Sequence, residues 1–146
     1  MKKETWLIVS SSCIARVFKV QRKESLVEIE TLVHPESRLH NRDLVTDNRP
    51  GRTHDSVGPG RHALESATTP KQQESIEFAR DVAEYLEKAR VSGSFDKLYL
   101  AASPAQLGLL RQNFHPSTIK LINGEVDKDM THMKPEEIIN NLPFLL

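Results

Sequence analysis

The sequence predicts a single α/β domain, a mixed five-stranded sheet with helices on its faces, and three observations support this prediction. Its 146 residues are enough for one hydrophobic core and too few for two. Three strand-like segments follow one another near the N-terminus. The remainder then alternates short apolar runs with amphipathic segments of helical spacing. The predicted order is therefore β-β-β-α-β-α-β-α, which fits one sheet covered by helices.

The three N-terminal segments read as an antiparallel meander. The run from Trp6 to Val9 is continuously apolar, as expected of a central strand that is buried on both faces. Ile14 to Val20 is rich in β-branched and aromatic residues, although Arg16 and Lys19 interrupt it. Leu26 to Val33 alternates apolar residues with glutamates, which predicts a half-solvated strand. Short polar connectors join the three segments, so we expect neighbouring strands to be antiparallel.

Two segments begin with the same pattern: a hydroxyl residue is followed by a proline, and a glutamine lies three positions after the hydroxyl residue. Thr69 to Gln72 reads TPKQ and Ser103 to Gln106 reads SPAQ, and both predict a capping box at a helix start. Gly93 offers a stop for the first of these helices. The apolar stripes that should face the sheet are Ile76, Ala79, Val82, Ala83, Leu86 and Ala89 in the first helix, and Leu107, Leu110 and Phe114 in the second.

The other predicted elements are shorter. Leu98 to Ala102 is apolar and should be a buried strand, and His115-Pro116 should end the helix that follows it. We expect a short strand at Ile119 to Ile122. A last helix should run from Lys134 to Leu142 and begin near Pro135.

The composition narrows the class of protein. Lys plus Arg and Asp plus Glu both number 20, so the net charge gives no steering toward nucleic acid or an anionic membrane. Cys13 is the single cysteine, which excludes an intramolecular disulfide and favours a reducing compartment. The sequence has no run of about 18 apolar residues that could span a membrane. We therefore expect a cytoplasmic protein.

Residues 34–68, which we call the arginine-rich segment, have neither helix nor strand periodicity. Five of the ten arginines and four of the six histidines lie between His34 and His62, and no lysine does. Arginine supplies a planar fork that binds phosphate or carboxylate through two hydrogen bonds, whereas a merely solvated loop gains as much from lysine. Such long segments are usually either functional or disordered, and both alternatives are open here. We predict an inserted binding loop within one domain of residues 1–146.

Two turns within this segment carry the candidate site. DNRPGR, residues 47–52, predicts a type II turn with an arginine at each end. These arginines could clamp a phosphate, or they could pair with the segment's own aspartates. GPGRH, residues 58–62, is a glycine-rich turn that could aim backbone N–H groups at an anion. The predicted binding residues are Arg38, Asn41, Arg42, Asp47, Arg49, Pro50, Gly51, Arg52, Gly58, Gly60, Arg61 and His62. We expect Arg38 to Arg52 to be ordered by Arg–Asp pairs, because too few apolar residues are present to offset the entropy of ordering.

These motifs resemble a known family. HPESRLHNRDL, DNRPGR and HDSVGPGRHALE are similar to the signature of the host attachment protein family, bacterial proteins named for a role in attachment to host cells. The resemblance resumes at Phe78-Ala79-Arg80, at LYLAASPAQLGLL (residues 98–110) and at residues 127–131. It implies a ribonuclease H-like fold, similar to the middle domain of archaeal and eukaryotic peptide release factors. A translation-associated role with RNA or the ribosome as partner follows from that likeness.

The chain departs from the catalytic patterns that this fold can carry. Release factors present a Gly-Gly-Gln tip, which this sequence lacks, so release activity is not expected. Ribonuclease H-like nucleases hold metal with a carboxylate on the first strand, but Thr5 to Ser11 has none, and Glu28 and Glu30 read as a solvated face. His34, His40, His54 and His62 lack zinc-ligand spacing. We predict no metal and no cofactor.

Two functions are compatible with these observations. The first is a non-catalytic adaptor that binds an anionic partner, RNA, the ribosome or a phosphate-bearing ligand, through the arginine-rich segment. The alternative is a hydrolase of phosphate or acyl esters, in which Arg49, Arg52 and His62 stabilise and protonate the substrate. The apolar tail from Pro143 to Leu146 should pack on the domain or on a second copy, which would give a homodimer.

Overall fold

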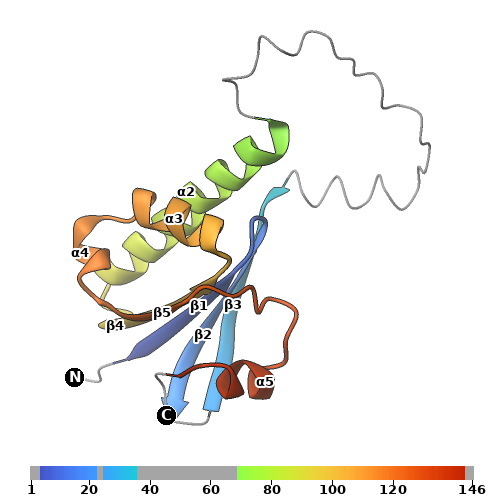
Figure 1. The fold of residues 1–146 in the computed structure, drawn as a ribbon. Helices are drawn as coiled ribbons and strands as arrows, with labels where there is room; N and C mark the ends of the chain where they lie inside the picture. Colours follow the sequence, from blue (N-terminus) through green and yellow to red (C-terminus); the bar gives the residue numbers. More distant parts are fainter. Residues whose placement is uncertain (1–3, 23–24, 36–68, 144–146) are drawn as a thin grey trace, which may run out of the picture.

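A computed structural model of the chain describes residues 4–22, 25–35 and 69–143, and these form one mixed five-stranded sheet between helices (Figure 1). The predicted α/β class and the number of strands are confirmed. The strands are β1 Thr5–Ser10, β2 Ile14–Arg22, β3 Ser25–Val33, β4 Lys97–Ala102 and β5 Ile122–Val126. The helices are α2 Pro70–Val91, α3 Pro104–Asn113, α4 Pro116–Ile119 and α5 Pro135–Asn140.

The central strand is β1, as its continuous apolar run predicted. The strand order is β3-β2-β1-β4-β5, with β1 antiparallel to β2 and parallel to β4. Leu7 and Ile8 point to opposite faces of this strand and are both buried, because both faces of the sheet are covered. Ser10 pairs with Ala102, so the carboxyl ends of β1 and β4 lie side by side. From there the chain continues to β2 on one side of the sheet and, through α3, to β5 on the other.

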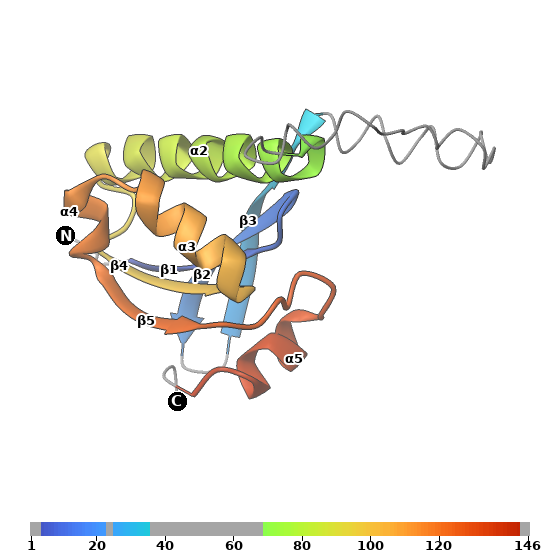
Figure 2. The ribbon, with the colours of Figure 1, turned by 45° about the horizontal axis from the view of Figure 1, so that its top comes forward.

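Two cores lie on opposite faces of the sheet. Helices α2 and α3 cover one face, and α5 with the segment before it covers the other (Figure 2). Ile8 and Val17 belong to the first core, whereas Leu7 and Phe18 belong to the second. This division follows from the alternation of side chains along a strand.

Helix α2 begins with the predicted capping box. The Gln72 backbone N–H donates to Thr69 Oγ1 at 3.0 Å, and the Thr69 N–H donates to Gln72 Oε1 at 3.0 Å. The helix ends at Val91, and Gly93 adopts φ +78°, a conformation that favours glycine. Its buried face is the predicted one with Phe78 added, while Ile76 is only half-buried.

Helix α3 starts at the predicted proline, but the capping box predicted there does not form. The Ser103 side chain makes no cap hydrogen bond. Gln106, which should have reached back to the N-cap, is only 2% exposed. The side chain is turned toward the protein interior, so burial has overridden the local capping preference.

The alternating burial predicted for the third strand is wrong. Val27 and Ile29 are 39% and 41% exposed, although they were expected to form the buried face. Strand β3 is an edge strand, and Val17 pairs with Glu30 while Phe18 pairs with Glu28, which leaves Ile29 as an extra residue. Such a bulge disrupts the alternation on which the prediction relied.

The strand predicted at residues 119–122 is displaced. Ile119 ends the short helix α4, in which Pro116 is the first residue and His115 Nδ1 accepts from the Ser117 N–H at 3.0 Å. Proline at a first helical position favours a helical turn, so the strand begins only at Ile122. The last helix begins at Pro135 as predicted and ends at Asn140, two residues before the predicted Leu142.

Candidate functional site

The two ends of the arginine-rich segment are fixed by described residues. Strand β3 leads into His34 and Pro35, and the chain is described again from Thr69, the N-cap of α2. A cavity of about 380 Å³ lies at the first of these ends. Its lining consists of His34, Pro35, Glu77, Arg80 and Asp81.

His34 is an anchor for the start of the segment. It is only 4% exposed, and its backbone N–H donates to the Cys13 carbonyl at 3.0 Å. The imidazole meets the Phe78 ring edge-on, with 6.3 Å between centroids, and its Nε2 lies 3.3 Å from Glu77 Oε1. The side chain is buried against α2 and contacts a glutamate.

Helix α2 supplies the charged wall of this cavity. Phe78 and Ala79 are buried, so the motif that carried part of the family resemblance is largely a packing motif, and Arg80 is its exposed member. Glu77 and Asp81 line the same wall. The wall thus presents one guanidinium and two carboxylates, a mixed polar surface without an excess of positive charge.

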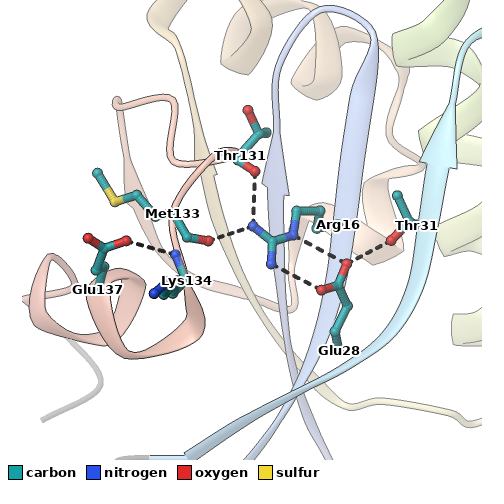
Figure 3. Close-up of polar contacts among 7 residues, drawn as sticks. All are labelled: Arg16, Glu28, Thr31, Thr131, Met133, Lys134 and Glu137. Atoms are coloured by element: carbon teal, nitrogen blue, oxygen red, sulfur yellow. Dashed lines mark hydrogen bonds and ion pairs between the residues drawn. The ribbon is translucent and has the colours of Figure 1, made fainter. Parts of the chain in front are cut away.

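A second polar cluster, which sequence reasoning missed, lies on the opposite side of the sheet (Figure 3). Arg16 binds Glu28 through two hydrogen bonds, Nε to Oε2 at 3.2 Å and Nη2 to Oε1 at 3.0 Å. Its Nη1 donates to the carbonyls of Thr131 and Met133 at 2.9 and 2.7 Å. These bonds tie β2 to β3 and to the segment before α5.

The Arg16 cluster is a structural site. The guanidinium also lies 5.0 Å from the centroid of the Phe18 ring, and Thr31 Oγ1 donates to Glu28 Oε2 at 2.7 Å. The hydrogen bonds from Arg16, together with the one from Thr31, hold the pKa of Glu28 below its ordinary value, against the opposing effect of burial. Because four N–H groups of Arg16 are committed, the fork is not available to a ligand. The sequence signal that could have indicated this cluster is an arginine within the β-branched and aromatic run of β2.

The site residues predicted from sequence are not tested by the structure. They lie outside the described residues, as does the predicted ordering of the stretch from Arg38 to Arg52. The residues concerned are Arg38, Asn41, Arg42, Asp47, Arg49, Pro50, Gly51, Arg52, Gly58, Gly60, Arg61 and His62.

The described ranges hold neither a metal-ion cluster nor a membrane-spanning helix. Among residues 4–22, 25–35 and 69–143, no group of three or more His, Cys, Asp or Glu side chains is placed to hold a metal ion. No helix within the same ranges is both long and apolar enough to cross a membrane.

Comparison with known families identifies the chain. The model of the family described as "Protein required for attachment to host cells" matches residues 6–142. The chain belongs to this family. The match confirms the resemblance carried by the motifs of the arginine-rich segment and of β4 and α3. A comparison with curated protein sequences gives no match.

Solved structures similar to this host-attachment domain include an archaeal translation termination factor, aRF1. The TM-score is 0.50 with 11% sequence identity, over 97% of this chain and 36% of that protein. A second structure, described as an archaeal protein, has a TM-score of 0.49 and 13% identity, over 94% of this chain and 33% of that one. The domain thus spans about a third of each structure. At this identity the first likeness shows a shared fold.

Proposed function

We propose that this member of the host-attachment family is a non-catalytic adaptor that binds RNA phosphates, including those of ribosomal RNA, through its arginine-rich segment. The observation that carries the proposal is the concentration of five arginines and no lysine between His34 and His62. Arginine in place of lysine favours bidentate recognition of phosphate over general solvation. We also propose that the protein has the role in attachment to host cells that the family description names.

The described residues support this function by their position. The segment starts at the buried His34 and leads into Thr69, the N-cap of α2, so both of its ends adjoin a packed scaffold. Arg80 lies in the wall of the cavity beside the first end and could add one more phosphate contact. Its neighbours Glu77 and Asp81 would repel an anion, so most of the affinity has to come from the segment itself.

The proposal also includes a fold assignment, a location in the cell and an oligomeric state. The strand order β3-β2-β1-β4-β5, with an antiparallel meander followed by parallel strands, supports a ribonuclease H-like assignment. We also propose a cytoplasmic location and a homodimer formed through the C-terminal tail, of which residues 144–146 lie outside the described ranges. The hydrolase alternative has no support among the described side chains, and its residues Arg49, Arg52 and His62 lie outside the described ranges.

RNA binding at two salt concentrations tests the proposal. Contacts to single-stranded phosphates predict that log K falls with log salt with a slope of about −0.7 per neutralised phosphate. The Arg49→Ala variant should bind more weakly, and Arg52→Lys should also lose affinity because it keeps the charge and loses the fork.

Arg111→Ala is the matched control, since it removes one positive charge from an exposed arginine that pairs with Glu125 on the far side of the sheet from β3. Its affinity for RNA should stay at the wild-type value. Salt-independent binding, or an equal loss in the Arg49 and Arg111 variants, would contradict recognition by the segment. Sedimentation of the protein with ribosomes, at the same two salt concentrations, shows whether the RNA partner is ribosomal.

A further inference from the structure

Strand β3 leaves one long edge of the sheet without a neighbouring strand among the described residues. It is the outermost strand of the order β3-β2-β1-β4-β5, and it is nine residues long, Ser25–Val33. The outer edge of such a strand presents backbone N–H and C=O groups that can pair with a further strand. Proteins often protect an edge with lysine, with proline or by making the strand short. Strand β3 contains neither lysine nor proline and is longer than a typical strand.

Two backbone positions near the end of β3 point away from the sheet. The His34 N–H donates to the Cys13 carbonyl at 3.0 Å, so these two residues form a hydrogen-bonded pair of the antiparallel ladder. They lie one position beyond the pair of Ile14 and Val33. Opposite residues in an antiparallel ladder alternate between bonded and unbonded pairs. The N–H and C=O groups of Val33 and Thr31 therefore face outward, where no described strand meets them.

The side chains of β3 define what can lie beside this edge. Val27 and Ile29 are 39% and 41% exposed, so they offer apolar surface to a neighbour. Glu30 is exposed and makes no hydrogen bond or ion pair with a described residue, whereas Glu28 is held by Arg16. The strand carries no positive charge. A segment with lysine or arginine beside Glu30 and apolar residues on either side would complement both features.

A second copy of β3 fits this edge poorly. Two copies related by a two-fold axis pair antiparallel, and an axis at Ile29 brings Glu28 of each copy opposite Glu30 of the other. An axis at Glu28 brings the two Glu28 side chains together. Like charges directly opposite each other in a sheet are destabilising. The edge thus favours a partner of different sequence, with the opposite charge.

We propose that the outer edge of β3 is a docking site for an extended basic peptide segment of another protein, which adds a strand to the five-stranded sheet. The main chain of the segment pairs with Thr31 and Val33, and a lysine or arginine lies beside Glu30. Its apolar residues cover Val27 and Ile29. In this mode of recognition, main-chain bonds supply affinity and alternate side chains supply specificity. The site is distinct from RNA binding by the arginine-rich segment, and either can fail without the other.

Fluorescence anisotropy of labelled synthetic peptides, titrated with the full chain, tests the proposal. The lysine peptide alternates valine and lysine over about eight residues, a usual strand length. The glutamate peptide has glutamate at each lysine position, and a third peptide repeats the lysine peptide with every backbone nitrogen methylated. We expect saturable binding of the lysine peptide and binding weaker by about tenfold or more for the glutamate peptide. The methylated peptide should not bind, because it keeps the charges but has no N–H donors for the ladder.

The deciding variant is Glu30→Lys, with Glu84→Lys as its matched control. Both residues are exposed, Glu84 lies on the side of α2 opposite its buried face, and the two substitutions change the net charge equally. Glu30→Lys should weaken binding of the lysine peptide by about five- to tenfold and strengthen binding of the glutamate peptide by a similar factor. Glu84→Lys should bind both peptides as the wild type does.

Hydrogen exchange followed by NMR locates the bound peptide. The amides of Thr31 and Val33 should exchange more slowly with the lysine peptide than without it, because the peptide supplies their acceptors. Absence of binding, equal losses in Glu30→Lys and Glu84→Lys, or binding without protection of these two amides overturns the proposal. A dimer of the free chain in which both amides are already protected overturns it as well, since β3 would then pair with itself.

Discussion

The starts of α2 and α3 have the same sequence pattern and different structures. Both place proline at the first helical position and a glutamine two residues later. At α2, Thr69 and Gln72 satisfy each other's backbone N–H groups. At α3 neither bond forms, and Gln106 lies buried beneath the helix start.

The difference shows that a capping motif closes a helix start only where its glutamine is free to turn back to the N-cap. Gln72 is exposed in the first turn of α2, so its side chain can turn back to the N-cap. Gln106 is only 2% exposed, and its side chain does not. A closed start stabilises its helix by itself. An open start leaves its first N–H groups without an acceptor from the cap side chain, at some cost in stability.

The largest expected effect comes from the core and should be equal for the two helices. Leu86 of α2 and Leu110 of α3 are both fully buried, so each change to alanine should lower the free energy of unfolding by about 2–5 kcal/mol. Urea unfolding measures both, with the exposed Glu84→Ala as control, which should change it by less than about 0.5 kcal/mol. A much smaller loss for Leu110 would mean that α3 packs more weakly on the sheet than α2 does.

The Arg16 cluster resembles the start of α2, because nearly all of its donors and acceptors make hydrogen bonds within the chain. Arg16→Ala removes bonds to Glu28 and to two backbone carbonyls, and should cost about 1.5–3 kcal/mol, toward the lower end because the pair is partly exposed. Lys19→Ala is the matched control, since Lys19 makes one exposed ion pair with Glu4 at 3.1 Å. It should cost about 0–1 kcal/mol. Equal losses in urea unfolding would show that Arg16 is an ordinary surface charge.

The two N-caps give the most direct energetic contrast. Thr69→Ala should lower the free energy of unfolding by about 1 kcal/mol, because it removes an acceptor used by the Gln72 N–H. Ser103→Ala should change it by about a few tenths of a kcal/mol at most, since that hydroxyl caps nothing. Comparable losses in chemical unfolding would mean that Ser103 does cap α3.

The smallest expected effect is a dependence on acidity. The folded-state pKa of Glu28 is lowered, chiefly by the hydrogen bonds from Arg16, from an ordinary value of 4.5. Stability from this pair is therefore fully present above pH 4.5 and is lost as the pH falls through the lower, folded-state pKa. The Glu28→Gln variant should lose less stability than the wild type between pH 4.5 and strongly acidic pH, as read from unfolding midpoints. A wild-type curve parallel to that of Glu28→Gln would argue against the shift.

Much of the fold could be predicted because the signals were local. The apolar run at β1, the TPKQ box of α2 and the glycine after it each depend on a few neighbouring residues. The failures depended on tertiary structure. The bulge beside Val17 that exposes Ile29, the burial of Gln106 and the partners of Arg16 all require knowing which segments lie side by side.

The same distinction applies to the candidate sites. The arginine-rich segment was recognisable from composition and motifs, and its residues are still a prediction. The cavity beside His34 could not be predicted, because nothing in the local sequence indicates that His34 is buried against α2.

The most direct test of the contrast between the two helix starts is amide hydrogen exchange of the full chain and of its Thr69→Ala and Ser103→Ala variants, followed by NMR. The account predicts faster exchange at the Gln72 amide in Thr69→Ala, because that N–H loses its acceptor, and unchanged exchange at Ala105 and Gln106 in Ser103→Ala, because the Ser103 hydroxyl caps nothing. Equal acceleration at the two helix starts, or none at Gln72, would contradict it.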